Sequence, residues 1–130
     1  MRRVVVTGMG IASCLGSALD TVSHALQELK SGIVAMPEYA ARGLRSQVAG
    51  VPQLDLDALI DRKLRRFMGN AAAYAYLSMR DAIADAGLAP EQVRHPRTGV
   101  IAGSGGGSPQ WQIETGDLLR AKGVRKVGPF

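Results

Sequence analysis

Two short apolar segments, each followed directly by a glycine turn, constrain the fold of this chain more than any other feature. Residues 3–7 contain three consecutive valines and end at the Gly-Met-Gly turn of residues 8–10. Residues 98–102 are also apolar and continue into the loop GSGGGS of residues 103–108. Such runs favour buried strands. Because a helical pattern follows each turn, the sequence predicts an α/β fold with a parallel, covered sheet.

The spacing of the remaining apolar residues predicts four helices. They are expected over residues 17 or 18 to 30, 55–68, 70–86 and 109–119. Asn70 is the expected N-cap of the third helix, and Gly87 with Pro90 is its expected stop. Residues 33–53 should be irregular, with a short strand near residues 46–49. Two confident strands are too few for a finished sheet, so residues 1–130 are expected to be an incomplete part of one domain, with no second domain present.

Composition narrows the class of protein. The chain is 46% hydrophobic and has a net charge of +5, which argues against disorder and allows an acidic partner. Only 5% of residues are aromatic, so a stacking surface for single-stranded nucleic acid is poorly supplied. The single cysteine, Cys14, fits a reducing compartment. We expect no signal peptide, no membrane span and no metal site.

The glycine turns could in principle bind a phosphate. The turn at residues 8–10 lacks the third glycine of a dinucleotide fingerprint, because Ser13 stands there, and no acidic residue follows a second strand at the required distance. A tight turn at the end of a core strand is therefore the favoured interpretation. No Gly-Lys-Ser or Gly-Lys-Thr follows the loop at 103–108. Its four glycines in six residues indicate that the backbone lies close to a ligand or to another chain.

Two further patterns invite a functional interpretation. Cys14 would need a base to act as a nucleophile, and neither His24 nor His95 is placed beside it by the sequence, so a small buried residue is the favoured interpretation. Half of the basic residues form two clusters, Arg62, Lys63, Arg65 and Arg66, then Arg120, Lys122, Arg125 and Lys126. Each cluster is either an ordinary solvated face or a site that binds phosphates or carboxylates. Near the first cluster, the negative charges of Asp55, Asp57 and Asp61 partly offset the positive charge.

Several segments, taken in order, are similar to one family. They are RVVVTGMG at residues 3–10, KSGI at 30–33, LIDRK at 59–63, RFM at 66–68, DAIADAGL at 81–88, VIAGSGGGS at 100–108 and VGP at 127–129. In this order they resemble the N-terminal part of a β-ketoacyl-acyl carrier protein synthase, a condensing enzyme of the thiolase superfamily. The resemblance covers essentially the whole chain. Glycine at position 106 resembles the type I elongating enzymes of that family.

The resemblance implies a thiolase-like fold, with α-β-α layers and a mixed sheet. It implies an acyltransferase of bacterial fatty-acid biosynthesis that condenses an acyl thioester with malonyl-acyl carrier protein in a decarboxylative Claisen reaction, with no cofactor. It further implies a cytoplasmic homodimer whose partner is the acyl carrier protein, loaded with acyl or malonyl groups, and neither nucleic acid nor a membrane as partner.

The resemblance also implies roles for particular residues. Gly106 would border the acyl pocket, where the missing side chain leaves room for the acyl chain. Gln112 resembles the polar residue that reaches across the dimer interface toward the partner's pocket. Five basic residues resemble carrier-docking positions, namely Arg62, Lys63, Arg66, Lys122 and Arg125.

The family's catalytic residues are not matched in this chain. Its nucleophilic cysteine, two histidines and lysine lie beyond the position that matches Phe130, so no catalytic residue is assigned here, and the 130-residue chain alone is expected to be inactive. Outside this family, the residues leave two alternatives open. One is a non-catalytic basic docking module for an acidic protein or nucleic acid, and the other is a degenerate nucleotide-binding domain.

Overall fold

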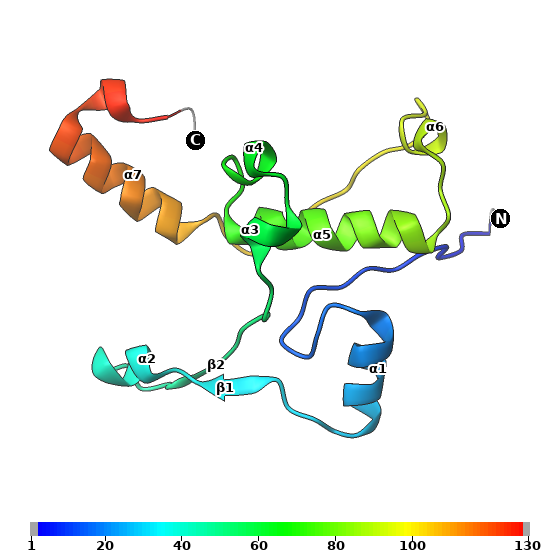
Figure 1. Ribbon diagram of the computed structural model, residues 1–130, viewed down its shortest axis with the longest axis horizontal. Helices are drawn as coiled ribbons and strands as arrows, with labels where there is room; N and C mark the ends of the chain where they lie inside the picture. The colour runs from blue at the N-terminus through cyan, green and yellow to red at the C-terminus, as the bar shows by residue number, and fades with distance from the viewer. Residues whose placement is uncertain (1–2, 129–130) are drawn as a thin grey trace.

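The computed structural model describes residues 3–128, so Pro129 and Phe130, which end the segment similar to the synthase family, lie outside the described residues. One long helix, α5, occupies the middle of the molecule, and the other elements extend from it (Figure 1). In chain order the elements are α1 (Leu19–Gln27), β1 (Ile33–Ala35), α2 (Pro37–Ala41), β2 (Val48–Gly50), α3 (Leu56–Leu59), α4 (Arg62–Arg65), α5 (Asn70–Asp85), α6 (Pro90–Val93), α7 (Pro109–Lys122) and the 3₁₀ helix η1 (Val124–Lys126). Among residues 3–128, no helix has both the length and the apolar character that a membrane crossing requires.

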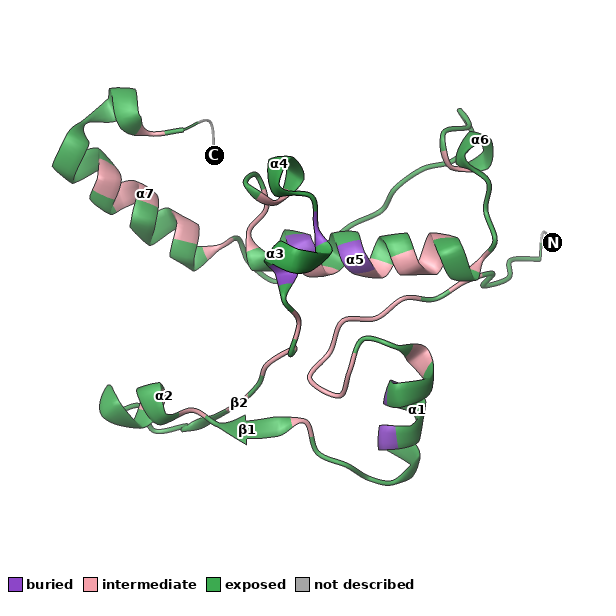
Figure 2. Ribbon diagram, in the orientation of Figure 1, coloured by how far each residue is buried: buried purple, intermediate pink, exposed green. Residues whose placement is uncertain are grey.

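The main hydrophobic core lies where α3 meets α5. Leu56 and Ile60, at the two ends of the α3 segment, are buried with Ala73 and Leu77 of α5. Figure 2 shows this buried group at the centre of a molecule that is otherwise largely exposed. Burial of such side chains contributes on the order of 1.5–3 kcal/mol for each large one. This contact therefore fixes α3, and the α4 segment that follows it, on the helix.

The predicted single helix over residues 55–68 is wrong, because two aspartates divide it. Asp55 accepts a hydrogen bond from the backbone N–H of Ala58 at 3.1 Å and caps α3. Ile60 then adopts an extended conformation, and Asp61 accepts from the Lys63 N–H at 2.8 Å and caps α4. A second N-cap restarts the helix in a new direction, so the basic residues of α4 are turned away from the axis of α3.

The other three predicted helices are confirmed as α1, α5 and α7. Gly69, rather than Asn70, is the N-cap of α5. Beyond its end, Gly87 has φ +62°, and the Leu88 N–H donates to the Ile83 carbonyl at 3.2 Å, which is the expected glycine stop. Pro90, which was expected to end the helix, is the first residue of the further short helix α6. Proline suits this position because the first N–H of a helix has no partner within the helix.

A small antiparallel hairpin lies within residues 33–50. β1 pairs with β2 in the register Ile33 to Gly50, Val34 to Ala49 and Ala35 to Val48. β2 confirms the strand expected near residues 46–49, whereas β1 and α2 lie in a stretch that was expected to be irregular. The residues of β1 are all exposed, so the hairpin is held by its backbone hydrogen bonds more than by burial.

The two strands that the sequence indicates most strongly are not formed as strands here. Residues 3–7 and 98–102 contain no paired strand, and Val4 and Ile101 are 93% and 97% exposed. The prediction of buried, paired strands at these positions is therefore wrong for this structure. A strand is stabilised by a neighbour that satisfies its backbone N–H and C=O groups, and among residues 3–128 no segment pairs with either one.

The molecule is open rather than tightly packed. Its accessible surface is 10,794 Å², whereas a compact protein of this mass exposes about 6,600 Å². Part of the exposed surface is apolar, and Val4, Val5, Val6, Val100 and Ile101 are each at least 76% exposed. An apolar surface of this extent indicates contacts with further protein.

The turn at residues 8–10 packs tightly on the C-terminal half of α5. A Cβ atom at Gly10 would lie 2.0 Å from the Ser78 carbonyl oxygen, and one at Gly8 would lie 2.3 Å from the Ala82 carbonyl oxygen. Between the two glycines, the Met9 N–H donates to Asp85 Oδ2 at 2.9 Å. The glycines are thus explained by contact with the chain's own helix, as expected for a tight turn, and they leave no room for a phosphate at that face.

We predict that Gly10→Ala destabilises the protein by roughly 1–3 kcal/mol, because the added methyl group overlaps the backbone of α5. Gly116→Ala is the matched control, since its Cβ would meet no atom closer than 3.8 Å and lies within a helix, where alanine is the better residue. Thermal unfolding measures both variants. Equal melting temperatures for Gly10→Ala and the unchanged protein would contradict this packing.

Candidate functional site

The glycine-rich loop after residue 102 and the first turns of α5 enclose an open groove of about 470 Å³. The groove is lined almost entirely by small residues, namely Gly69, Ala71, Ala72, Ala75, Ala102, Gly103, Ser104, Gly106, Gly107 and Ser108. Small side chains on both walls leave space for an apolar ligand. The wall formed by residues 103–108 agrees with the expectation that this loop lies close to a ligand or another chain, whereas the wall formed by α5 was not predicted. The run of small residues at 69–73, which contains Gly69 and three alanines, is the signal that could have indicated the second wall.

Gly106 lies on the loop wall of this groove, and its role at an acyl pocket stays a prediction. A Cβ atom at this position would meet no atom within 4 Å. Within this chain, close packing therefore does not require a glycine at position 106, and the missing side chain leaves open space. Gln112 lies on the first turns of α7, and its Nε2 is 3.4 Å from the Cβ that Gly107 would have. The structure therefore places Gln112 beside the loop that bears Gly106. Its reach toward a partner subunit stays a prediction.

The loop is fixed firmly at its C-terminal end. Ser108 is the N-cap of α7, and its Oγ accepts from the Trp111 N–H at 3.5 Å. Gly69, the N-cap of α5, lies so close to Ser108 that a Cβ on Gly69 would be 2.9 Å from the Ser108 Cβ. The starts of α5 and α7 are thus held together, and the groove opens beside this contact.

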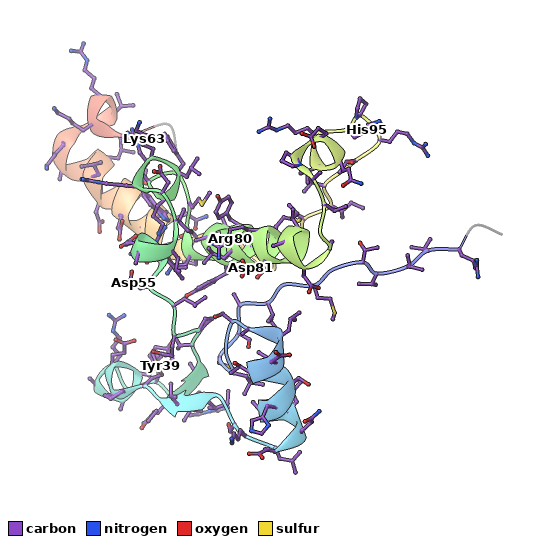
Figure 3. The ribbon with its side chains drawn as sticks, turned by 45° about the vertical axis from the view of Figure 1, so that its right-hand side comes forward. Tyr39, Asp55, Lys63, Arg80, Asp81 and His95 are labelled. Carbon is purple, nitrogen blue, oxygen red and sulfur yellow. The ribbon has the colours of Figure 1, made fainter. Side chains whose placement is uncertain are left out.

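The first basic cluster is presented by α4 and its C-cap. Arg62 and Lys63 begin α4, Arg66 ends it, and all three side chains are exposed. Figure 3 shows Lys63 on α4, pointing away from α5. The Arg66 guanidinium lies 4.7 Å from the centre of the Phe67 ring, a cation–π contact that limits its motion. Within residues 3–128, none of these three cations forms an ion pair with a carboxylate.

The neighbouring carboxylates are engaged elsewhere. Asp55 and Asp61 cap α3 and α4 through their side chains. Asp57 lies 3.0 Å from Arg65 Nε. Asp57 therefore offsets Arg65, whereas within residues 3–128 none of the three carboxylates forms an ion pair with the side chains of Arg62, Lys63 or Arg66.

Arg65 differs from its basic neighbours. Its side chain is only 20% exposed, it donates to Asn70 Oδ1 at 3.0 Å, and it donates to the Met68 carbonyl. It therefore links α4 to the start of α5, beside the groove. Arg65 is a structural residue, whereas Arg62, Lys63 and Arg66 are available to a partner.

The second predicted docking cluster lies on other elements. Lys122 is the last residue of α7, and Arg125 lies in η1. Gly123, at φ +76°, separates the two helices. In the same region Arg120 pairs with Asp117 at 2.9 Å. Lys122 and Arg125, the two residues to which the resemblance assigns a docking role, are exposed. Their role, like that of the α4 cluster, stays a prediction.

The remaining chemical candidates do not form a catalytic pair among the described residues. Cys14 is half-buried beside Gly32 and Gly50, close enough that a Cβ on Gly32 would lie 2.8 Å from its Sγ. His24 lies on α1 and contacts Glu28 at 3.6 Å, while His95 lies beyond α6, away from α1 (Figure 3). Cys14 and His24 line a common shallow groove, and no hydrogen bond joins them in the described part of the chain.

Comparison with known proteins adds independent evidence. The family model described as "Beta-ketoacyl synthase, N-terminal domain" matches residues 1–130. The chain is 49% identical over 132 residues to 3-oxoacyl-[acyl-carrier-protein] synthase 1 of Escherichia coli (strain K12), covering 100% of this chain and 32% of that protein. It is 35% identical over 130 residues to 3-oxoacyl-[acyl-carrier-protein] synthase 2 of Coxiella burnetii, covering 99% of this chain and 31% of that protein. The chain thus spans about a third of the length of these relatives.

A solved structure gives the same result for the fold. The crystal structure of a β-ketoacyl synthase from Burkholderia phymatum STM815 superposes on this chain with a TM-score of 0.81 at 33% identity, covering 99% of this chain and 32% of that one. The thiolase-like fold predicted from the sequence is therefore confirmed, although the two strongest strand segments are unpaired in this structure.

We predict that Arg65→Ala lowers the free energy of unfolding by about 1–3 kcal/mol, because it removes three contacts around the start of α5. Arg62→Ala serves as the control and should change stability by less than about 0.5 kcal/mol, as is usual for an exposed side chain. Chemical denaturation measures both. A loss at Arg62 equal to that at Arg65 would contradict the division between structural and available arginines.

Proposed function

The chain belongs to the β-ketoacyl synthase family through its N-terminal domain, and we propose on this basis that it is the first part of a 3-oxoacyl-[acyl-carrier-protein] synthase of type 1. The observation that supports the type is the 49% identity to the Escherichia coli synthase 1 over the whole chain, against 35% to the Coxiella burnetii synthase 2. Residues 1–130 would form an incomplete portion of the enzyme's N-terminal domain.

The proposed reaction is chain elongation in fatty-acid synthesis. An acyl group is transferred to the enzyme, malonyl-acyl carrier protein loses carbon dioxide, and the resulting carbanion attacks the acyl thioester to give a 3-oxoacyl product. This chain would supply binding surfaces, and the catalytic cysteine, histidines and lysine would come from the remainder of the protein. The complete enzyme would be a cytoplasmic homodimer that needs no cofactor or metal.

The groove beside Gly106 supports a role in acyl binding. Its walls are glycine and alanine apart from Ser104 and Ser108, and it is open to solvent. An acyl chain needs a long apolar space without polar partners, which such walls provide. Gln112 would lie at the edge of this space and contact the second subunit.

The basic surface supports a role in carrier docking. Arg62, Lys63 and Arg66 are exposed, and the nearby acids are bound in local contacts. Lys122 and Arg125 would extend this surface. Such a cluster would attract an acidic carrier protein and raise the rate of association more than the affinity. Salt would weaken this attraction by screening the exposed charges.

We expect Arg62→Glu with Arg66→Glu to weaken binding of the acyl carrier protein about tenfold or more at low salt. The control is Arg94→Glu with Arg97→Glu, two exposed residues beyond α6 whose replacement changes the net charge equally. Surface plasmon resonance on the complete protein measures both affinities. If the control weakens binding as much as the α4 variant, the attraction is one of net charge and the docking site is not on α4.

We expect Gly106→Ile to shorten the longest acyl product, because the added side chain would extend into the groove from an open position. The products formed by the complete protein from malonyl-acyl carrier protein are separated by chain length and quantified. Gly116→Ile places the same side chain on α7, outside the groove residues, and should leave the longest product unchanged. A product range unaffected by Gly106→Ile would contradict the proposed pocket.

A further inference from the structure

We infer that Ser104 is a positioning residue for acyl-chain length, because its hydroxyl holds the backbone of Gly106 at the wall of the groove. This inference rests on the proposed function of the groove. It concerns the shape of the wall, not the chemistry of the reaction.

Ser104 contacts Gly106 twice. Its Oγ donates a hydrogen bond to the Gly106 carbonyl oxygen at 2.5 Å, and it accepts from the Gly106 N–H at 3.4 Å. Both backbone groups of Gly106 are therefore satisfied by one hydroxyl two residues earlier. In the described part of the chain, these are the only hydrogen bonds that reach Gly106.

Packing does not fix this part of the loop. A Cβ atom on Gly103, Gly105 or Gly106 would meet no atom of this chain within 4 Å, so no side chain among residues 3–128 restricts the backbone there. Glycine itself has the widest conformational freedom of any residue. The end of the loop is fixed by the Ser108 cap, but its middle depends on the Ser104 hydroxyl for a defined conformation.

The hydroxyl also has a chemical consequence for an apolar ligand. A carbonyl group without a hydrogen-bond partner is costly when an acyl chain covers it and excludes water. Because Ser104 donates to the Gly106 carbonyl, an acyl chain can lie along this wall without leaving that oxygen unpaired. The penalty for losing the hydroxyl should therefore grow with the length of acyl chain that passes Gly106.

The test uses the complete protein with acyl primers of increasing length and compares Ser104→Ala, Ser104→Thr and the unchanged enzyme. We expect Ser104→Ala to raise KM for the longest primers about threefold to tenfold, the range that one neutral hydrogen bond supports, and to leave the shortest primer unaffected. Ser104→Thr retains a hydroxyl and should restore most of the loss. Ser23→Ala, on the exposed face of α1, is the matched control.

The outcomes separate this inference from the proposed function. If the unchanged protein condenses no primer at all, the proposed function fails. If it condenses primers and Ser104→Ala has the same KM profile, the positioning role is wrong while the proposed function stands. A fall in activity that is equal for all chain lengths, together with a lower melting temperature, would show a general structural role for Ser104 and would also overturn the inference.

Discussion

Close packing onto α5 is the interaction on which the rest of this structure depends. Leu56 and Ile60 pack against one face of the helix, the glycine turn at residues 8–10 lies against the backbone of its C-terminal half, and Ser108 contacts Gly69 at its start. Each contact places a different feature, namely the basic α4 segment, the N-terminal apolar segment and the glycine-rich loop. Because the molecule is otherwise open, a change in α5 would move all three, whereas a change in an outlying element such as the β1–β2 hairpin would move little else.

The two glycine turns have opposite physical purposes although they look alike in the sequence. At residues 8–10 the missing side chains allow the turn to touch its own helix, at distances where no Cβ fits. At Gly103, Gly105 and Gly106 a Cβ atom would point into open space within this chain. On the opposite wall, the alanines of α5 carry only small side chains. The first turn therefore serves packing, and the second leaves a groove. The groove of small residues and the exposed basic segment are the two features that support the proposed roles in acyl binding and carrier docking.

Local signals predicted much of this architecture. Helical spacing and the Gly87 stop gave α1, α5 and α7 to within a few residues, and the order of short motifs indicated the family and its fold. The predictions that failed concern residues whose structure depends on contacts with other segments, and hydrophobic periodicity does not reveal such contacts. Asp61 divides one predicted helix by capping α4, which its sequence context did not distinguish from an exposed acid. The valines of residues 3–7 have strong strand propensity, yet a strand forms only beside another strand. Arg65 could not be separated from Arg62 and Arg66 until its contacts with Asp57 and Asn70 were known.

We propose that this chain is part of an enzyme that condenses acyl and malonyl thioesters. The most direct test of this proposal is to supply the complete protein with an acyl-acyl carrier protein and with malonyl-acyl carrier protein labelled at the free carboxyl carbon, and to measure labelled carbon dioxide together with the 3-oxoacyl product. We expect both to be formed in equal amounts and neither to accumulate without the enzyme. Absence of both, under conditions in which the Escherichia coli synthase 1 is active, would contradict the proposal.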